Sequence, residues 1–519
     1  MDGVTYHETT SHHRERMSGG RMDRATQPFP FKRYPDSLER LALPRESGFP
    51  AMTMAEALAS PEALSQPLSV DRLARLLSLT CGLTASVGTI YLRSNPSAGA
   101  LYPVETYVAL PSGWDAAGDD PGGVFHYDPG DHALTRLRRG DGAAYAATMC
   151  RLPEGAGPPA AVFLFTTIFH RTAWKYGNRG YRYVLLDAGH VAENLLLACR
   201  AEHLGAAWVT EFADTAANSL LGVDTTREVC MGLAAVYQGQ RPDTAPPAQP
   251  RGLEPIEDRQ VMAEASRTAE GEPDYPMIQE IHEAGNQDKA MAMRPGPILD
   301  AEALGLDALE TAMLPGAAGL FAGRPMPSLA ETILSRRSMR GFLPQQPDSH
   351  TANALLRLVC ERLEGGGSEP DRTVATLVAM DGGEDGTGLY VLNRKAGSLT
   401  RVRTLAERYP DGYLRNGVAD ACLGQGWLKR AGLIFFFVTD VARLEAELGP
   451  RGYRRAGLLA GRLGERVYVG AKALGMGACG VGAFFDGELA AVLGMESPKA
   501  AGSGGRILYA VAAGPCKTR

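Results

Sequence analysis

The sequence predicts an α+β protein built from two tandem copies of one domain. Residues 160–177 and 432–449 resemble each other at an offset of 272, and the match continues without a gap to Gly222 and Gly494. The stretch between the two halves is rich in Pro, Glu, Gln and Ala and has no strand pattern, which indicates a linker. Because solenoid repeats span only ~20–50 residues, a period this long indicates domain duplication.

Each half contains the same predicted order of elements. It begins with a helix and an apolar strand, continues with a second strand and a long helix, and ends with a closing strand. The ranges are 70–77, 105–110, 162–166, 181–202 and 229–236 in the first half, and 351–363, 373–380, 433–438, 453–473 and 506–512 in the second. Helices and strands mix without regular βαβ alternation, so we expect a central antiparallel or mixed sheet flanked by helices in each half. Two such halves packed together would form an intramolecular pseudo-dimer.

The expected domain boundaries follow the changes in composition. A chain of 519 residues is too long for one hydrophobic core and suits two large domains. We expect residues 1–66 to form an N-terminal extension and the start of domain 1, and residues 67–240 to complete that domain. Residues 241–300 are expected to be the linker, with a helix near 277–284, and residues 301–519 the second domain.

Charge and cysteine usage exclude several classes of protein. The net charge of −6 provides no basic surface for nucleic acid. No stretch approaches the ~18 apolar residues of a membrane span, and no secretory h-region is visible near the start. Eight cysteines are scattered singly without metal-ligand spacing, which is typical of reduced thiols. We therefore expect a cytoplasmic protein without a metal site or a membrane partner.

Two motifs have the composition of a cofactor site. In Ser335–Phe342 (SRRSMRGF), the guanidiniums of Arg336, Arg337 and Arg340 and the hydroxyl of Ser338 can hold a phosphate. The alternative is a solvated basic helix end. In the first half, Pro96, Ser97, Ala98 and Gly99 form a turn of small residues that lets a flat ring approach the backbone; the alternative is an ordinary surface turn.

Two further motifs add a possible base and a close backbone approach. A lysine beside a tyrosine, as at Lys175 and Tyr176, can lower the pKa of the phenol and make it a base or proton relay, although most such pairs are surface pairs. The second motif follows the long helix of the second half and consists of Gly477, Ala478, Cys479 and Gly480, whose backbone amides could reach a ring. Cys479 is expected to be a small packing residue, because nothing nearby in sequence would activate its thiol.

Together these motifs resemble the SagB/ThcOx-type FMN-dependent dehydrogenases of the nitroreductase superfamily. The string PSAGALYP at 96–103, followed by FHYDP at 125–129, is close to diagnostic of that group. The segment RRSMRGF is similar to the one that holds the FMN phosphate in nitroreductases. The resemblance implies FMN as cofactor and oxidation of an azoline (thiazoline or oxazoline) or related C–N unit. It places proton removal at Lys175 and Tyr176, implies reoxidation by oxygen, and makes biosynthetic enzymes possible partners.

The two halves have kept different motifs. Residues 54–65, where the first half should have its arginines, contain none, and Glu447 and Leu448 stand at the second half's Lys-Tyr position. Residues 367–372 of the second half lack the PSAG turn, and Trp208 replaces the glycine found at Gly480. In homodimeric nitroreductases FMN lies between subunits. The resemblance therefore implies one working flavin site per chain, composed from both halves, and a second pseudo-symmetric site that does not work.

Two alternatives remain open at this point. The same flavin cradle suits an NAD(P)H-dependent reductase of nitro compounds or quinones. A non-catalytic module that binds peptides would also accumulate degraded motifs. Residues 187–190, on the first long helix, are expected to have a packing role, and Lys517 could add to phosphate binding.

Overall fold

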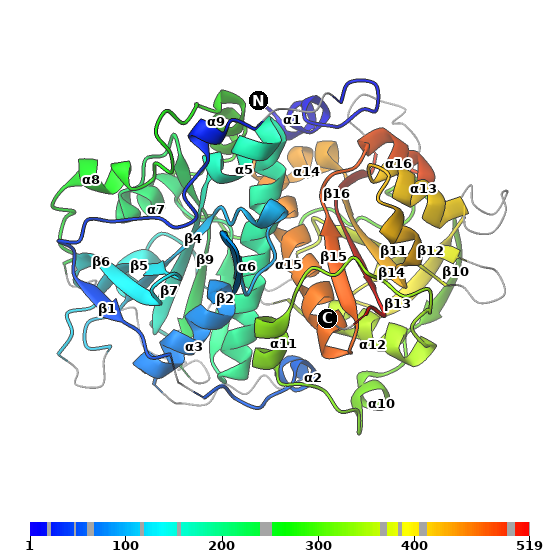
Figure 1. The fold of residues 1–519 in the computed structure, drawn as a ribbon, viewed down its shortest axis with the longest axis horizontal. Coiled ribbons are helices and arrows are strands. Elements are labelled where there is room, and N and C mark those ends of the chain that lie inside the picture. The colour runs from blue at the N-terminus through cyan, green and yellow to red at the C-terminus, as the bar shows by residue number, and fades with distance from the viewer. Residues whose placement is uncertain are drawn as a thin grey trace.

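Two seven-stranded antiparallel sheets of the same topology form the two halves of the chain, one on each side of Figure 1. The computed structural model describes residues 1–17, 22–45, 48–59, 67–114, 119–152, 157–238, 252–363, 371–381, 387–403, 413–495 and 504–517. The strand order β1-β6-β5-β4-β7-β9-β8 of the first sheet is repeated as β10-β13-β12-β11-β14-β16-β15 in the second. The predicted α+β class with two sheet-centred halves is therefore confirmed.

The strands predicted at 105–110, 162–166 and 229–236, and at 373–380, 433–438 and 506–512, are present in the two sheets. The first sheet contains β1 (Arg40–Ala42), β4 (Val104–Leu110), β5 (Gly123–Asp128), β6 (Ala133–Arg139), β7 (Ala161–Ile168), β8 (Gly205–Val209) and β9 (Glu228–Tyr237). The second contains β10 (Ala308–Met313), β11 (Ala375–Asp381), β12 (Thr387–Asn393), β13 (Ser398–Val402), β14 (Leu433–Thr439), β15 (Gly477–Val481) and β16 (Arg506–Gly514). A separate hairpin consists of β2 (Leu83–Val87) and β3 (Ile90–Arg93). The central strands β7 and β14 are buried along their whole length, which explains their continuous apolar sequence.

Helices cover the sheets and fill the space between them. The first half has α1 (Gly3–Thr9), α2 (Met54–Ala59), α3 (Val70–Cys81), α4 (Gly142–Ala147), α5 (Phe169–Tyr176), α6 (Gly180–Ala201) and α7 (Asp214–Leu221). The stretch predicted as linker contains α8 (Arg259–Glu264) and α9 (Pro276–Ala284). The second half has α10 (Ala317–Phe321), α11 (Leu329–Ser335), α12 (Ser349–Cys360), α13 (Tyr413–Ala421), α14 (Val441–Leu448), α15 (Arg451–Ala473) and α16 (Asp486–Val492). None of the helices in the described ranges is long and apolar enough to cross a membrane.

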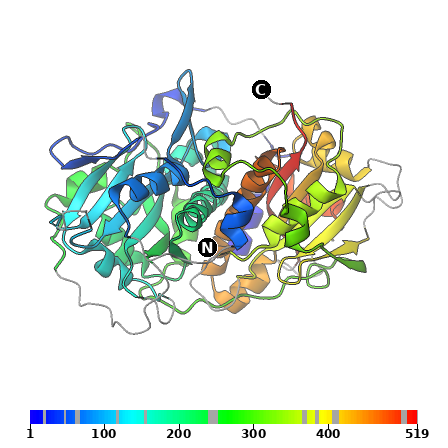
Figure 2. The same cartoon turned by 90° about the horizontal axis from the view of Figure 1, so that it is seen from below.

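The long helices α6 and α15 pack against each other at the centre of the molecule, between the two sheets (Figures 1 and 2). Every residue of α6 except Arg200 is buried, and every residue of α15 except Lys472. Their backbones come close at two glycines related by the offset of 272. A Cβ at Gly189 would lie 2.2 Å from the carbonyl oxygen of Leu458, and one at Gly461 would lie 2.2 Å from that of Leu186. Only glycine permits this approach.

Buried ion pairs at this interface obey the same internal twofold relation. Asp486 of the second half accepts from Arg179 at 2.8 Å and from Arg182 at 2.7 Å. The offset predicts a matching set, because 214 + 272 = 486. That set is Asp214 with Arg451 and Arg454, each at 2.6 Å. Since a buried charge needs a partner, the two halves hold each other through the same contact made twice.

Candidate functional site

The segment Arg336–Gly341 lies along the free edge of the second sheet. Strand β15 is the last strand of that sheet, so one row of its backbone groups is available for pairing. Ser338 forms a parallel bridge with Ala478, and the backbone N–H of Met339 donates to the carbonyl of Ala478 at 2.8 Å. The C-terminal tail joins the same edge, where the N–H of Lys517 donates to Gly341 at 3.3 Å. Three motifs far apart in the sequence are thus brought together.

The side chains of this segment point in different directions. Ser338 and Arg340 are exposed, whereas Arg336 is buried and crosses to the first half. There its guanidinium donates to the carbonyl of Ser94 at 2.9 Å, immediately before the PSAG turn. Arg337 also reaches the first half, through the carbonyl of Thr84 at 3.3 Å. Two of the predicted phosphate ligands therefore join the two halves in this structure, and the other two face solvent.

The PSAG turn is held by an acidic residue that sequence reasoning assigned to packing. The carboxylate of Asp187, on α6, accepts from the hydroxyl of Ser97 and, at 3.3 Å, from the backbone N–H of Ala98. Asp187 is only 3% exposed, and this burial raises its pKa to about 7, although the bonds from Ser97 and Ala98 oppose the shift. Two sequence features could have indicated a special role for Asp187. It is the only acid in the apolar run VLLDAGHV, and the matching position of the second half, 187 + 272 = 459, holds Leu459.

Lys175 and Tyr176 lie directly against this turn. They end α5, and the chain turns at Gly177 with a φ of 55°. A Cβ built on Gly99, whose φ is 68°, would lie 2.9 Å from the hydroxyl of Tyr176 and 3.1 Å from Nζ of Lys175. Gly99 is therefore required both by its left-handed backbone and by the space that these two side chains fill.

The expected effect of Lys175 on the phenol is wrong. The pKa of Tyr176 is raised well above its ordinary value, first because the side chain is buried and then because of Tyr183 and Asp187. The positive charge that opposes this shift belongs to Arg340, from the other half of the chain. Lys175 Nζ lies 5.3 Å from the centroid of the Tyr176 ring.

The glycine segment has a packing role that the sequence did not indicate. A Cβ at Gly480 would lie 1.8 Å from the hydroxyl of Tyr509, and the N–H of Gly480 donates to the hydroxyl of Tyr468 at 2.5 Å. That amide is thus already used within the protein. Burial raises the pKa of the Cys479 thiol, with Arg340 opposing it, which agrees with a packing role for this cysteine.

A buried polar network lies beneath the motifs and connects the two long helices. The imidazole of His190 hydrogen-bonds Glu465 at 2.7 Å through Nδ1 and Tyr509 at 3.2 Å through Nε2. Tyr468 continues the polar layer, with its hydroxyl 3.1 Å from that of Ser338. No sequence pattern predicts this network, because its members come from α6, α15, β16 and the segment after α11.

At the position of the first half that matches Gly480, a large residue replaces the glycine, and a glycine replaces the large residue that packs against it. Strand pairing relates Gly205 to Tyr237 in the first sheet and Gly477 to Gly514 in the second, so the closing strands correspond at an offset of 514 − 237 = 277. Trp208 thus corresponds to Gly480, and Gly232 to Tyr509. A Cβ at Gly232 would lie 2.2 Å from the Trp208 ring. The indole of Trp208 therefore occupies the space in which any other residue at position 232 would place its side chain.

The motifs of the two halves meet at one end of the domain interface, which we call the composite site. Its residues fit a bound flavin. Beside the PSAG turn, Oδ1 of Asn95 and Oγ of Ser94 are buried and have no hydrogen-bond partner among the described residues. Unpaired buried acceptors and hydroxyls are rare unless a ligand or water meets them. On the other side of the site, Ser338 and Arg340 offer a hydroxyl and a guanidinium suited to a phosphate. In the first half α2 contains no arginine; residues 60–66 and 364–370, which include positions compared with these two motifs in the sequence, lie outside the described residues.

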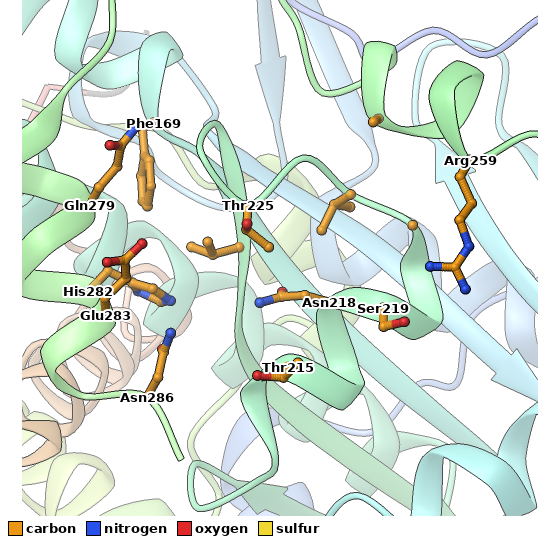
Figure 3. Close-up of a pocket in the computed structure, with 14 residues that line it drawn as sticks. Phe169, Thr215, Asn218, Ser219, Thr225, Arg259, Gln279, His282, Glu283 and Asn286 are labelled. Atoms are coloured by element: carbon orange, nitrogen blue, oxygen red, sulfur yellow. The ribbon is translucent and has the colours of Figure 1, made fainter. Parts of the chain in front are cut away.

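A cavity of about 420 Å³ lies elsewhere, between α7, α8 and α9 (Figure 3). The side chains of Asn218, His282 and Thr215 surround it. No residue that the sequence predicted for the flavin site lines this cavity. We therefore assign the candidate active site to the junction of the two halves and not to this pocket.

Comparison with known proteins agrees with the duplicated fold. The model of the nitroreductase family matches residues 63–239 and again residues 333–514. MJ1384 of Methanocaldococcus jannaschii, assigned as a nitroreductase, is 31% identical over 162 residues, which is 31% of this chain and 78% of that protein. The trifolitoxin-processing protein TfxB of Rhizobium leguminosarum bv. trifolii is 28% identical over 184 residues, 34% of this chain, and the match spans about half (48%) of TfxB.

A solved structure extends the similarity to the whole chain. A protein of Anabaena variabilis, assigned as a nitroreductase, superposes with a TM-score of 0.72 at 24% identity, covering 100% of both chains. At this identity the similarity shows the fold. The family, the tandem arrangement and the resemblance to SagB-type proteins, predicted from the motifs, are confirmed by these matches. The chain belongs to the nitroreductase family and carries two copies of its domain in tandem.

Proposed function

We propose that the chain is an FMN-dependent dehydrogenase with one working flavin site, composed from both halves. The observation that supports this most directly is the meeting of complementary motifs at one end of the domain interface. Arg336 of the second half bonds the backbone at Ser94 beside the PSAG turn, and the charge of Arg340 acts on Tyr176 of the first half. At the other end the matching positions hold Trp208 and Leu448 in place of Gly480 and Tyr176.

In this proposal the two halves hold different parts of the cofactor. Ser338, Arg340 and, after turning from their present carbonyl partners, Arg336 and Arg337 hold the phosphate. The PSAG turn, fixed by Asp187, lines the flat ring. Once bound, FMN supplies the two-electron acceptor. The remaining chemistry belongs to the side chains above the turn.

Tyr176 is the proposed group for moving the substrate proton. In oxidation of an azoline ring, two hydrogens leave as one proton and one hydride while a ring double bond forms. Because its pKa is raised, the phenol of Tyr176 is neutral near pH 7. It therefore acts as a relay that accepts the substrate proton as it passes its own to solvent, which the half-buried side chain reaches. Lys175, exposed at the same turn, orients an anionic or carbonyl group of the substrate.

The proposed substrate is an azoline or related C–N unit in a peptide or other natural product. The relative TfxB is named as a processing protein of trifolitoxin, which supports a modified peptide as substrate and partner enzymes of a biosynthetic pathway. None of the eight cysteines, which all lie in the described ranges, forms a disulfide bond, and we propose the cytoplasm as the compartment in which they stay reduced. A second candidate is an NAD(P)H-dependent nitro or quinone reductase, which the neutral phenol of Tyr176 favours because that form can donate a proton.

Flavin content and two turnover assays test the proposal. We expect about one FMN per purified chain, oxidation of a thiazoline-containing peptide in air, and loss of that activity in Tyr176→Phe and Lys175→Ala with FMN retained. Tyr145→Phe, in the distant helix α4, is the matched control and should behave as the wild type. Reduction of nitro compounds by NADH without azoline oxidation would select the reductase. A chain that takes up no FMN on reconstitution contradicts both enzymes and leaves the peptide-binding module.

A further inference from the structure

A second cavity, of about 820 Å³, lies at the other end of the domain interface. Its walls come from β8 of the first half, from β11, β12, the end of α12 and the middle of α15 of the second half, and from residues 298–302. This cavity surrounds the position related to the composite site by the internal twofold. Trp208, which lines it, corresponds to Gly480, since 208 + 272 = 480.

The charge at this position differs from that at the composite site. Two further lining residues correspond to the buried polar pair beside the PSAG turn, because 187 + 272 = 459 and 190 + 272 = 462. Leu459 therefore stands in place of Asp187, and Arg462 in place of His190. At these two positions an acid has been lost and a guanidinium gained, which changes the local charge toward positive.

Several buried polar atoms in the cavity wall have no partner. Nη2 of Arg462, Oγ1 of Thr210 and Oγ1 of Thr376 make no hydrogen bond in the part of the chain that the structure describes. Arg462 is 4% exposed, Thr210 5% and Thr376 1%, so bulk water does not satisfy them. Native proteins rarely leave buried polar atoms unpaired, so these three atoms are available to a ligand or to water in the cavity.

The lining carries five basic side chains against four acidic ones, and the acids nearest Arg462 and Arg394 also pair with other arginines. Glu193 is shared between Arg462 and Arg466, and Asp371 pairs with Arg455 at 3.1 Å.

The guanidinium of Arg394 donates to the backbone carbonyl of Asp371 at 3.4 Å. Burial, and then the nearby charges of Arg462 and Arg466, lower the pKa of Arg394, although Asp371 and Cys360 oppose this. An anion placed between Arg394 and Arg462 would relieve this repulsion.

The rest of the wall suits an apolar body. Trp208, Val374, Val391 and Leu459 line the cavity beside the arginines. The phosphate-holding segment of the composite site has no basic counterpart here, because the sequence at 61–65 is PEALS. The cavity thus offers guanidiniums, among them those of Arg394 and Arg462, and an apolar wall, without the FMN-type phosphate grip.

We propose that this cavity is a second ligand site, which binds an organic anion: a carboxylate or phosphate on a flat apolar body. The anion lies between Arg394 and Arg462, with Thr210 and Thr376 completing its hydrogen bonds, and the body packs on Trp208 and Leu459. The proposal does not rest on flavin binding or on turnover at the composite site.

Calorimetric titration of the full chain, loaded with FMN, tests this with 2-naphthoate as the probe and 2-naphthalenemethanol as its neutral counterpart. We expect about one saturable site per chain for the carboxylate and at least tenfold weaker binding of the alcohol. Arg394→Gln should weaken naphthoate binding about tenfold or more, as expected for a charge-assisted hydrogen bond. Arg430→Gln, an exposed arginine after α13, is the matched control and should bind as the wild type.

A second variant separates ligand binding from a structural role. Thr376→Val keeps the shape and removes an unpaired buried hydroxyl, so it should raise the melting temperature of the free protein while weakening naphthoate binding several-fold. A purely structural threonine would not weaken binding. Equal naphthoate affinity in Arg394→Gln and Arg430→Gln, equal binding of the neutral alcohol, or no saturable binding overturns the proposal. So does a second FMN per chain that naphthoate displaces, because the cavity would then be a flavin site.

Discussion

Replacing Asp187 by Asn removes the ionisation of a buried carboxyl and should make the protein more stable at alkaline pH. Asp187 has a pKa of about 7 in the fold, against 3.8 for an exposed aspartate. A carboxyl with a raised folded pKa contributes stability that is fully present below the unfolded value. This contribution is lost as pH rises from about 4 to about 7, because the unfolded chain releases the proton first.

The size of the effect follows from these two values. At pH 5.5 the buried carboxyl lowers the free energy of unfolding by about 2 kcal/mol relative to a neutral side chain, and at pH 8.5 by about 4 kcal/mol, at ~1.4 kcal/mol per unit. Hydrogen bonds that Asn changes at the PSAG turn contribute equally at both pH values. The stability of Asp187→Asn minus that of the wild type should therefore increase by about 2 kcal/mol between pH 5.5 and pH 8.5.

Urea denaturation of both proteins at pH 5.5, 7.0 and 8.5 measures this difference. The flavin-free form is used, so that cofactor affinity does not enter the result. Asp36→Asn, at an exposed aspartate of the N-terminal segment, is the control and should show no such change. A difference between Asp187→Asn and the wild type that stays constant within about 0.5 kcal/mol from pH 5.5 to 8.5 would refute the reasoning, since the carboxyl would then be ionised throughout.

Two further predictions concern the interface between the halves. Gly461→Ala should lower the free energy of unfolding by more than ~2 kcal/mol in urea denaturation, because its Cβ would meet the Leu186 carbonyl at 2.2 Å; Gly487→Ala, where a Cβ meets nothing within 4 Å, should not. Asp486→Asn should cost about 3 kcal/mol at pH 7, because it leaves Arg182 buried without its carboxylate. The charges of Arg182 and Arg179 depress the pKa of the Asp486 carboxyl below its unfolded value. The stability that Asp486 contributes is therefore present down to about pH 4 and is lost only as pH falls further. Equal denaturation midpoints for wild type and Asp486→Asn at pH 7 would contradict this.

The duplication carried most of the fold information in the sequence. The pairing of Gly180-Tyr181-Arg182 with Gly452-Tyr453-Arg454 predicted two equivalent long helices, and the structure has α6 and α15 there. Hydrophobic runs located the central strands, because strands such as Leu433–Thr439 are buried on both faces and lack any competing pattern.

The chemistry of the site was less accessible from the sequence. Motifs with unusual composition, such as RRSMRGF, can be recognised in the sequence. Their meeting at one sheet edge follows from the duplicated topology. The sequence did not show that burial would raise the pKa of Tyr176, since burial depends on residues far along the chain. Asp187 and Tyr509 were missed for the same reason: each acts through a partner from another element.

The exchange of large and small residues between Trp208–Gly232 and Gly480–Tyr509 has a consequence for how such a chain can change. In a dimer of identical subunits every mutation occurs twice, once on each side of the axis, so both ends of the interface must tolerate it. Joining two copies in one gene removes that requirement. A tryptophan at one end could be accommodated by a glycine beside it, while the other end kept the opposite arrangement. Single reversions are now unfavourable, since each would leave either a hole or a collision, and the asymmetry has become difficult to undo.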